Sequence, residues 1–237
     1  MYLWVKYFMR LLLLFLIVST LSHAQAIRLG QFKKVKVFDG IRLTIIPSGA
    51  DSLMVEGKNK DFLSYKNKNG KLYLRMDIKR RLGGFNTTVA LFSSSPLEEI
   101  DANEGAFVSC QDVLFQPSIV LKAQEGAEID ALLDVQKVKT KTASGGIVNL
   151  KGAAVVQYHS LVTGGIVEAA MLDSEQVEVK VKAGGRAAVN ASELAEINVS
   201  LGGSVSVYGQ PKKLIKSVAV SGNIEQKSTS SETQENE

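Results

Sequence analysis

Between Glu104 and Gly222 the chain divides into short segments in which apolar and polar residues alternate. Alternation with a period of two indicates strands, because successive side chains of a strand point to opposite faces. Each segment follows a glycine, and the marker glycines are Gly105, Gly126, Gly145, Gly164, Gly184, Gly202 and Gly222, spaced by 21, 19, 19, 20, 18 and 20 residues. A repeat near 20 residues that consists of strands predicts a solenoid.

Superposing these segments aligns similar residues into columns. Two columns are apolar and contain Val148, Val167, Ala187 and Val205, then Leu150, Ala169, Val189 and Val207. The column between them contains Asn149, Glu168, Ala188 and Ser206. We therefore expect the apolar columns to face an interior and the third column to face water. A second strand precedes each following glycine, as in Val177, Val179 and Val181 or in Ile197, Val199 and Leu201.

Coils of this kind predict an all-β fold, a single-stranded parallel β-helix in which each coil of about 20 residues buries its face against its neighbours. At a strand spacing of ~4.8 Å, six coils give a rod about 30 Å long. The crossover rule makes a right-handed solenoid the expected form.

The glycines are predicted to form the corners between strands. This set comprises Gly105, Gly126, Gly145, Gly146, Gly164, Gly165, Gly184, Gly185, Gly202, Gly203 and Gly222. A phosphate-binding loop would occur once, between a strand and a helix, whereas these glycines recur in every coil without a helical pattern. We therefore interpret a pair such as Gly164-Gly165 as a corner rather than as a cradle for an anion.

Residues 27–96 are predicted to form β-hairpin strands that lead into the coils of residues 97–224 as one continuous domain. "VKVFDGIRLTIIPSG" alternates and then turns at Pro47–Gly49, and Asn69-Gly70 separates two alternating runs, which is a strong hairpin signal. A further strand is expected between Gly83-Gly84 and Pro96.

The two ends have a different composition. Residues 1–26 combine Lys6 and Arg10, the apolar run Leu11–Leu21 and small residues up to Ala26, which is the layout of a cleaved secretory signal. A transmembrane anchor is the alternative, but the run is short for ~30 Å of hydrocarbon, so we expect no transmembrane segment in the mature chain. Residues 225–237 contain no apolar side chain and are predicted to form a disordered polar tail. The expected location is the periplasm, the cell surface or the medium.

Removing the leader changes the charge and the candidate chemistry. Of the 28 basic residues 26 remain, against 24 acidic ones, so the net charge falls from +4 to +2 and no nucleic-acid partner is indicated. Cys110 is then the one cysteine and His159 the one histidine. We expect Cys110 to be a buried thiol and His159 to be a surface or hydrogen-bonded histidine without a zinc partner.

No catalytic, cofactor or metal site is predicted. Asp101, Asn103 and Gly105 resemble the start of a calcium loop but lack its remaining ligands. A polysaccharide lyase or hydrolase on this scaffold is the alternative function, and it would need clustered carboxylates with a base. The acids Asp130, Asp134, Asp173 and Glu175 fit solvated turns better, and Lys180 and Lys182 fit an outward strand face.

A possible contact patch is basic. It comprises Lys66, Lys68, Lys71, Lys79, Arg80 and Arg81, with Tyr65 and Tyr73 nearby. Such a patch could contact anionic glycans or lipid headgroups of an envelope. The alternative is a charged edge that prevents pairing between the strands of different molecules.

The segments "FDGIRLTIIPSG", "LMVEG", "NGKLYLRM" and "LEEIDANEGAFV", followed by the glycine-pair coils, resemble the auto-transporter adhesin head GIN domain family (DUF2807-like) of Bacteroidetes envelope proteins. The resemblance covers residues 32–224. It implies a right-handed β-helix and export, and it transfers no catalytic residue. Many such proteins look like lipoproteins, whereas the leader here contains no cysteine. We expect an exported, non-catalytic adhesion, interaction or structural module whose partner could be a glycan or a protein.

Overall fold

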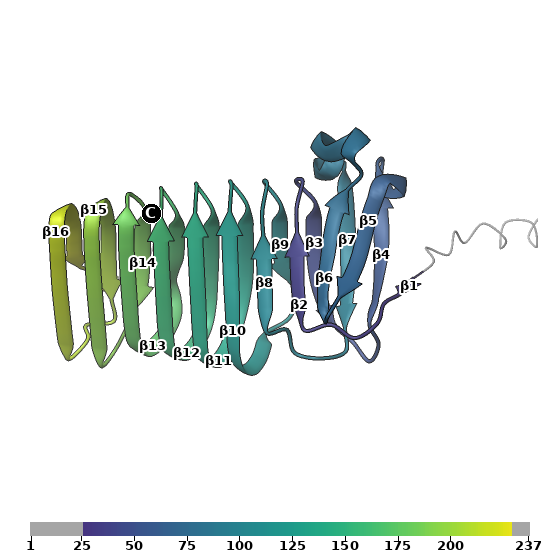
Figure 1. The fold of residues 1–237 in the computed structure, drawn as a ribbon. Coiled ribbons are helices and arrows are strands. Elements are labelled where there is room, and N and C mark those ends of the chain that lie inside the picture. The colour runs from purple at the N-terminus through teal and green to yellow at the C-terminus, as the bar shows by residue number, and fades with distance from the viewer. Residues whose placement is uncertain (1–25, 229–237) are drawn as a thin grey trace, which may run out of the picture.

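The computed structural model describes residues 26–228, without the side chains of residues 80–83. In this part of the chain sixteen strands join in one sheet, which winds into a solenoid of about seven turns with coils of about 19 residues. Figure 1 shows the coils side by side along a straight rod, with the N-terminal strands at one end and β16 at the other. The all-β solenoid predicted from the alternation is confirmed. The predicted signal lies almost wholly outside the described residues, as do residues 229–237 of the predicted tail.

The elements follow the chain in a regular order. The strands are β1 (Ile27–Arg28), β2 (Lys34–Val37), β3 (Arg42–Pro47), β4 (Ser52–Gly57), β5 (Leu63–Lys68), β6 (Lys71–Met76), β7 (Thr87–Ser93), β8 (Glu99–Ala102), β9 (Phe107–Cys110), β10 (Leu114–Gln124), β11 (Glu128–Ala143), β12 (Ile147–Val162), β13 (Ile166–Ala183), β14 (Arg186–Asn190), β15 (Leu194–Tyr208) and β16 (Lys213–Gln226). Two 3-10 helices, η2 (Lys60–Phe62) and η3 (Ile78–Asn86), lie among the N-terminal strands.

Parallel pairing between coils places the columns in register. Val148 pairs with Val167, Val167 with Ala187, and Ala187 with Val205. All eight residues of the two apolar columns are at most 1% exposed, so the prediction of an apolar interior is confirmed. Leu201 differs from the pattern, because the register of β15 and β16 shifts around it and its side chain is 56% exposed.

The two glycines of the pair Gly164-Gly165 have different roles. Gly164 has φ +74°, a left-handed conformation that a Cβ would oppose, but a Cβ there would meet no atom within 4 Å. A Cβ on Gly165 would lie 2.4 Å from Thr142 Oγ1 and 2.7 Å from the Thr142 carbonyl oxygen of the preceding coil. The first glycine therefore permits the turn, and the second permits the close approach of two coils.

The corner amides are already hydrogen-bonded. Gly145 N donates to Thr163 O at 3.3 Å, Gly164 N to Ala183 O at 3.2 Å, and Gly184 N to Leu201 O at 2.9 Å. These N–H groups point along the rod to the next coil, so they are not available to an anion. The corner at Gly202 and Gly203 differs from these three corners, because strand β15 continues through it instead of ending before it.

The N-terminal strands pair differently from a run of hairpins. β5 and β6 do form the predicted hairpin, with Asn69 and Gly70 both at positive φ. β3, however, pairs in parallel with β7 and β9, and β4 pairs with β7 and β1 rather than with β3. Turn residues such as those at Pro47 mark where a strand ends, but they do not determine which strand becomes its neighbour.

The last strand at the C-terminal end of the rod is β16, in which no side chain is fully buried. Positions of β16 that pair with interior residues include Lys216, which lies opposite Ile197, and Val218, which lies opposite Val199. Lys216 Nζ donates to Ile224 O at 3.2 Å across this end. β16 includes Glu225 and Gln226, which were predicted to belong to the polar tail, and Lys227 N donates to Val207 O at 2.8 Å.

Residues 26–228 contain no helix long and apolar enough to span a membrane.

A polar cluster interrupts the apolar interior. His159 is 3% exposed, and its Nδ1 lies 2.8 Å from Thr140 Oγ1 while its Nε2 lies 2.7 Å from Gln157 Oε1. Gln157 Nε2 in turn donates to Leu172 O and to Ser174 Oγ. Burial lowers the pKa of His159 to about 3, so the ring is neutral in the folded protein. The histidine is therefore a hydrogen-bonded interior residue, one of the two alternatives expected from the sequence.

Substitution of Gly165 should test the corner. We expect Gly165→Val to lower the free energy of unfolding by about 2 kcal/mol or more, because the new side chain would overlap the backbone of Thr142. Glu168→Gln is the control, because it changes an exposed ion pair with Arg186 and should cost less than about 1 kcal/mol. Urea unfolding followed by circular dichroism measures both. A larger effect of Glu168→Gln would contradict the corner role.

The buried histidine should make stability depend on pH. His159 takes up a proton near pH 6.5 in the unfolded chain but only near pH 3 in the folded chain. The stabilising contribution of the neutral ring is therefore fully present above pH 6.5 and is lost as the pH falls from 6.5 toward 3. The expected slope of this contribution is about 1.4 kcal/mol per pH unit. Urea unfolding between pH 8 and pH 4 should show a shallower slope for His159→Asn than for the native chain. Equal slopes would exclude this contribution.

Candidate functional site

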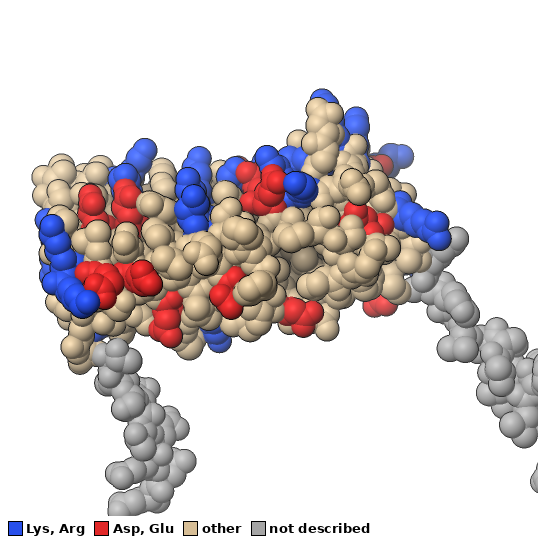
Figure 2. Space-filling model, turned by 90° about the horizontal axis from the view of Figure 1, so that it is seen from below, with Lys and Arg blue, Asp and Glu red and all other residues tan. Residues whose placement is uncertain are grey.

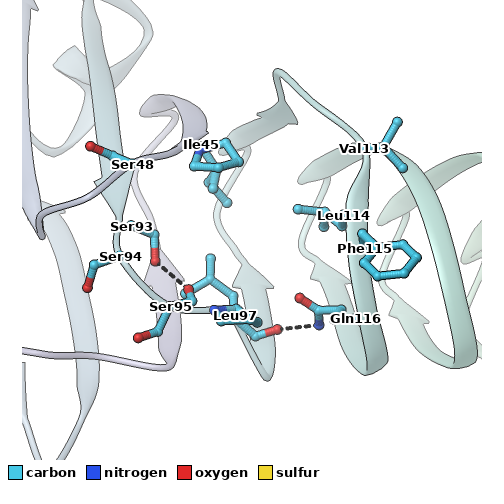
Figure 3. Close-up of a pocket in the computed structure, with 12 residues that line it drawn as sticks. Ile45, Ser48, Ser93, Ser94, Ser95, Leu97, Val113, Leu114, Phe115 and Gln116 are labelled. Atoms are coloured by element: carbon cyan, nitrogen blue, oxygen red, sulfur yellow. Dashed lines mark hydrogen bonds between the residues drawn. The ribbon is translucent and has the colours of Figure 1, made fainter.

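A cleft of about 300 Å³ lies where the first long coil strand, β10, meets the N-terminal strands (Figure 3). Its lining residues are Ile45, Pro47, Ser48, Ser93, Ser94, Ser95, Pro96, Leu97, Val113, Leu114, Phe115 and Gln116. They come from the end of β3, the segment after β7 and the start of β10. The cleft therefore forms because the N-terminal strands and the coils are held together in one solenoid.

Phe115 is exposed because of the alternation in β10. Its neighbours Leu114 and Gln116 point inward and are each 8% exposed, whereas the Phe115 ring is 80% exposed. The Gln116 amide Nε2 donates to Leu97 O at 2.8 Å and to Ser118 O at 2.7 Å. These bonds fix the start of β10 against the opposite wall, as the dashed line between Gln116 and Leu97 in Figure 3 shows.

Short polar side chains form the opposite wall. Ser93 Oγ donates to Ser95 O at 2.8 Å, and Ser94 N donates to Asp51 Oδ1 at 2.7 Å. Ser48 N donates to Ser93 O at 2.9 Å, which ties the end of β3 to the end of β7. In Figure 3 the labelled serines lie across the cleft from Val113 and Phe115. The wall thus presents hydroxyl groups on a backbone that is held in place.

The chemistry of this cleft suits binding. None of its twelve lining residues is an acid, a base, a histidine or a cysteine. It combines an exposed aromatic ring, aliphatic side chains, hydroxyl groups and one amide. Such a surface can bury an apolar face of a ligand and form hydrogen bonds at its edges, whereas proton transfer needs a titratable group.

A second hollow of about 510 Å³ lies on the sheet that contains the outward column of Asn149 and Glu168. Its apolar lining includes Leu132, which is 41% exposed, and Met171, which is 63% exposed. Asn149 Nδ2 donates to Asp130 Oδ1 at 2.6 Å, and Arg186 Nη2 donates to Glu168 Oε1 at 2.8 Å. Both carboxylates of this hollow therefore have partners from the neighbouring coil.

Cys110 lies at the edge of the second hollow and is partly buried. Burial raises the pKa of its thiol to about 12, and the charge of Asp130 adds to the increase. The thiolate is the reactive form of cysteine, so this side chain is inert at neutral pH. Cys110 therefore agrees with the expectation of a buried, unreactive thiol, although its side chain is not fully enclosed.

The residues that resembled a calcium loop are engaged in ion pairs and hydrogen bonds. Asp101 Oδ2 lies 3.0 Å from Lys36 Nζ, and Asp101 Oδ1 accepts from Asn103 Nδ2 at 2.7 Å. Next to them Glu99 accepts from Lys71 and from Lys122. Burial opposes the charge on Glu99, but these two lysine hydrogen bonds hold its pKa at about 2. Among residues 26–228 no group of three or more acids, histidines and cysteines is placed to hold a metal ion.

The six residues of the basic patch do not lie at one place. Lys68 and Lys71 flank the turn between β5 and β6, and Lys71 is paired with Glu99. Lys66 lies further along β5, beside Tyr73 on β6. Lys79 lies in η3, beyond the opposite end of β6, and the side chains of Arg80 and Arg81 are outside the described part. A contact surface around these lysines stays a prediction.

The cleft beside Phe115 was not found from the sequence. The alternation in "DVLFQPSIVL" does place Phe115 opposite in direction to Leu114, which is a signal that could have identified an exposed ring. The opposite wall, however, comes from residues about 20 positions earlier, at the end of β7, and from β3. That contact depends on the pairing of β3 with β7, which the turn signals did not specify.

A family model described as "Putative auto-transporter adhesin, head GIN domain" (DUF2807) matches residues 31–211. The fold is similar to the crystal structure of a putative adhesin from Bacteroides fragilis, with a TM-score of 0.77, 21% identity, and coverage of 86% of this chain and 95% of that chain. It is also similar to a putative adhesin from Parabacteroides distasonis, with a TM-score of 0.68, 19% identity and the same coverage of 86% and 95%.

A third similar structure is that of a putative lipid binding protein from Parabacteroides distasonis, with a TM-score of 0.64 and 15% identity over 86% of this chain and 95% of that one. At these identities the likeness shows a shared fold. The sequence matches no protein among those with curated functions.

Proposed function

Because the chain belongs to the auto-transporter adhesin head GIN domain family, we propose that it is an exported, non-catalytic binding module of the cell envelope. The cleft beside Phe115 is its binding site. The observation that carries this proposal is an aromatic ring that is 80% exposed beside a hydrogen-bonded wall of serines.

An exposed ring at this position contributes little to the fold. Phe115 points away from the interior that Leu114 and Gln116 help to fill, so the solenoid does not need its aromatic side chain. Apolar side chains beside a concave surface with a few polar groups are typical of ligand sites. The neutral lining favours an uncharged ligand, such as a sugar ring or an apolar side chain of a partner protein.

The descriptions of similar proteins support an envelope role. Of the similar structures, two are described as putative adhesins and one as a putative lipid binding protein. The predicted leader of residues 1–26 would direct the chain out of the cytoplasm, to the periplasm, the cell surface or the medium. A rod that presents a side cleft could hold a partner there without changing its own shape.

A polysaccharide-cleaving enzyme is the alternative, and the second hollow is the observation that favours it. This hollow contains Asp130, Glu168 and Lys151 beside apolar residues. The carboxylates, however, are hydrogen-bonded to Asn149 and to Arg186, which suits a structural ladder along the rod. Incubation of residues 27–237 with acidic and neutral polysaccharides, followed by an assay for new reducing or unsaturated ends, separates the two functions.

Removal of the Phe115 ring should weaken binding without unfolding the protein. We expect residues 27–237 to bind a subset of neutral glycans on an array, and Phe115→Ala to reduce that binding by at least about tenfold, as loss of a central aromatic anchor does. The unfolding temperature should stay within about 2 °C of the native value, because an exposed surface substitution changes stability little.

Met171→Ala is the matched control, because Met171 is also exposed and apolar but lines the second hollow. Binding should be unchanged in this variant. If Met171→Ala weakens binding and Phe115→Ala does not, the ligand occupies the second hollow. If no glycan or envelope protein binds across a broad panel, the binding role is wrong.

A further inference from the structure

A row of three exposed lysines lies on β11. Lys137, Lys139 and Lys141 alternate with the buried residues Val138 and Thr140, so their side chains all leave the same face of the sheet. In the part of the chain that the structure describes, none of the three has an ion pair. We call Lys137, Lys139 and Lys141 the lysine row.

Four other lysines of this face are paired with acids. Lys36 is paired with Asp101, Lys71 and Lys122 with Glu99, and Lys180 with Glu178. The positive charge of the lysine row is therefore not part of this network. Figure 2, seen from below, shows basic side chains that project from the upper edge of the rod, while several acidic side chains lie lower on the face in view.

The coils on either side of the row supply no acid next to it. On β12 the paired positions are Val156, Tyr158 and Ser160, and on β10 they are Ser118, Val120 and Lys122. The nearest acid on the β13 side is Glu178, which lies opposite Tyr158 on the next coil and is already bound to Lys180. The row is thus a narrow basic strip with no acid at the paired positions, where the one charged neighbour is Lys122, itself paired with Glu99.

The spacing of the row suits a linear polyanion. Alternate residues of a strand are ~6.7 Å apart, so the three ammonium groups start at evenly spaced points over ~13 Å. Tyr158 lies beside the middle lysine, with Lys139 Nζ 5.7 Å from the centre of its ring. A chain of acidic sugars could place carboxylates along the lysines and rest a ring on Tyr158.

We propose that the lysine row binds an acidic polysaccharide whose chain runs along β11. A membrane surface is less suitable, because a flat bilayer would also cover the neighbouring coils, whose lysines Lys122 and Lys180 are already paired with Glu99 and Glu178. The inference goes beyond the cleft beside Phe115, since the row lies on another strand and no residue of that cleft takes part in it.

Polygalacturonate is the probe for this inference, and fully methyl-esterified polygalacturonan is the matched uncharged ligand. We expect residues 27–237 to bind polygalacturonate in low salt and to bind the ester at least about tenfold more weakly. Added sodium chloride should weaken the first interaction, because screening shortens the range of exposed charges. Biolayer interferometry with immobilised polysaccharide measures each affinity.

The triple variant Lys137→Gln, Lys139→Gln, Lys141→Gln should lose affinity for polygalacturonate by about tenfold or more, at an unchanged unfolding temperature. The control is Lys66→Gln, Lys68→Gln, which removes two exposed lysines from β5 and should keep the affinity within about twofold. The triple variant should still bind neutral glycans at the Phe115 cleft like the native chain, since no residue of the row lines that cleft, so failure of the cleft proposal and failure of this one are distinguishable.

Three results would overturn the inference. The first is native affinity in the triple variant, and the second is an equal loss in the control, which would instead support the surface around β5. The third is tighter binding to vesicles of phosphatidylglycerol in phosphatidylcholine than to polygalacturonate, which would assign the lysine row to a membrane surface.

Discussion

The hydrogen bonds between successive coils are the constraint on which the rest of this structure depends. From β9 to β15 the strands have their backbone partners in the coils before and after them, and the coils are about 19 residues long. At the corners the same rule holds, as in the bond from Gly164 N to Ala183 O. Glycine is required there because a Cβ at Gly165 would meet the Thr142 backbone of the preceding coil.

This constraint limits which residues can occupy inward positions, whereas outward positions tolerate many residue types. An inward residue must fit its neighbours in two other coils, and a polar one must also find partners, as His159 does with Thr140 and Gln157. An outward residue needs only to be compatible with strand pairing. A column can therefore contain Asn149, Glu168 and then Ala188 without a change in the fold. Differences in binding between such rods are expected in the outward columns.

The sequence predicted the parts of the fold that repeat. The apolar columns that contain Val148 and Leu150 could be predicted from alternation and glycine spacing, because the same inward positions recur in each coil and pack against the equivalent positions of the next coil. The N-terminal strands do not repeat, and the insertion of β7 between β3 and β4 depends on long-range pairing that local turn signals do not specify. The Phe115 cleft was missed for that reason. The lysine row was visible as alternation in "KVKTK", but its lack of acidic neighbours depends on the register of three coils.

The Phe115 cleft and the lysine row would attract a ligand by different interactions. The Phe115 cleft is neutral and concave, so it can recognise the shape of a short segment and should respond little to salt. The lysine row is flat and charged, so its attraction extends over about a Debye length, ~8 Å at physiological ionic strength, and is weakened by salt. A rigid rod keeps the separation between β10 and β11 fixed. A glycan that contacts both surfaces would gain affinity because its second contact is intramolecular.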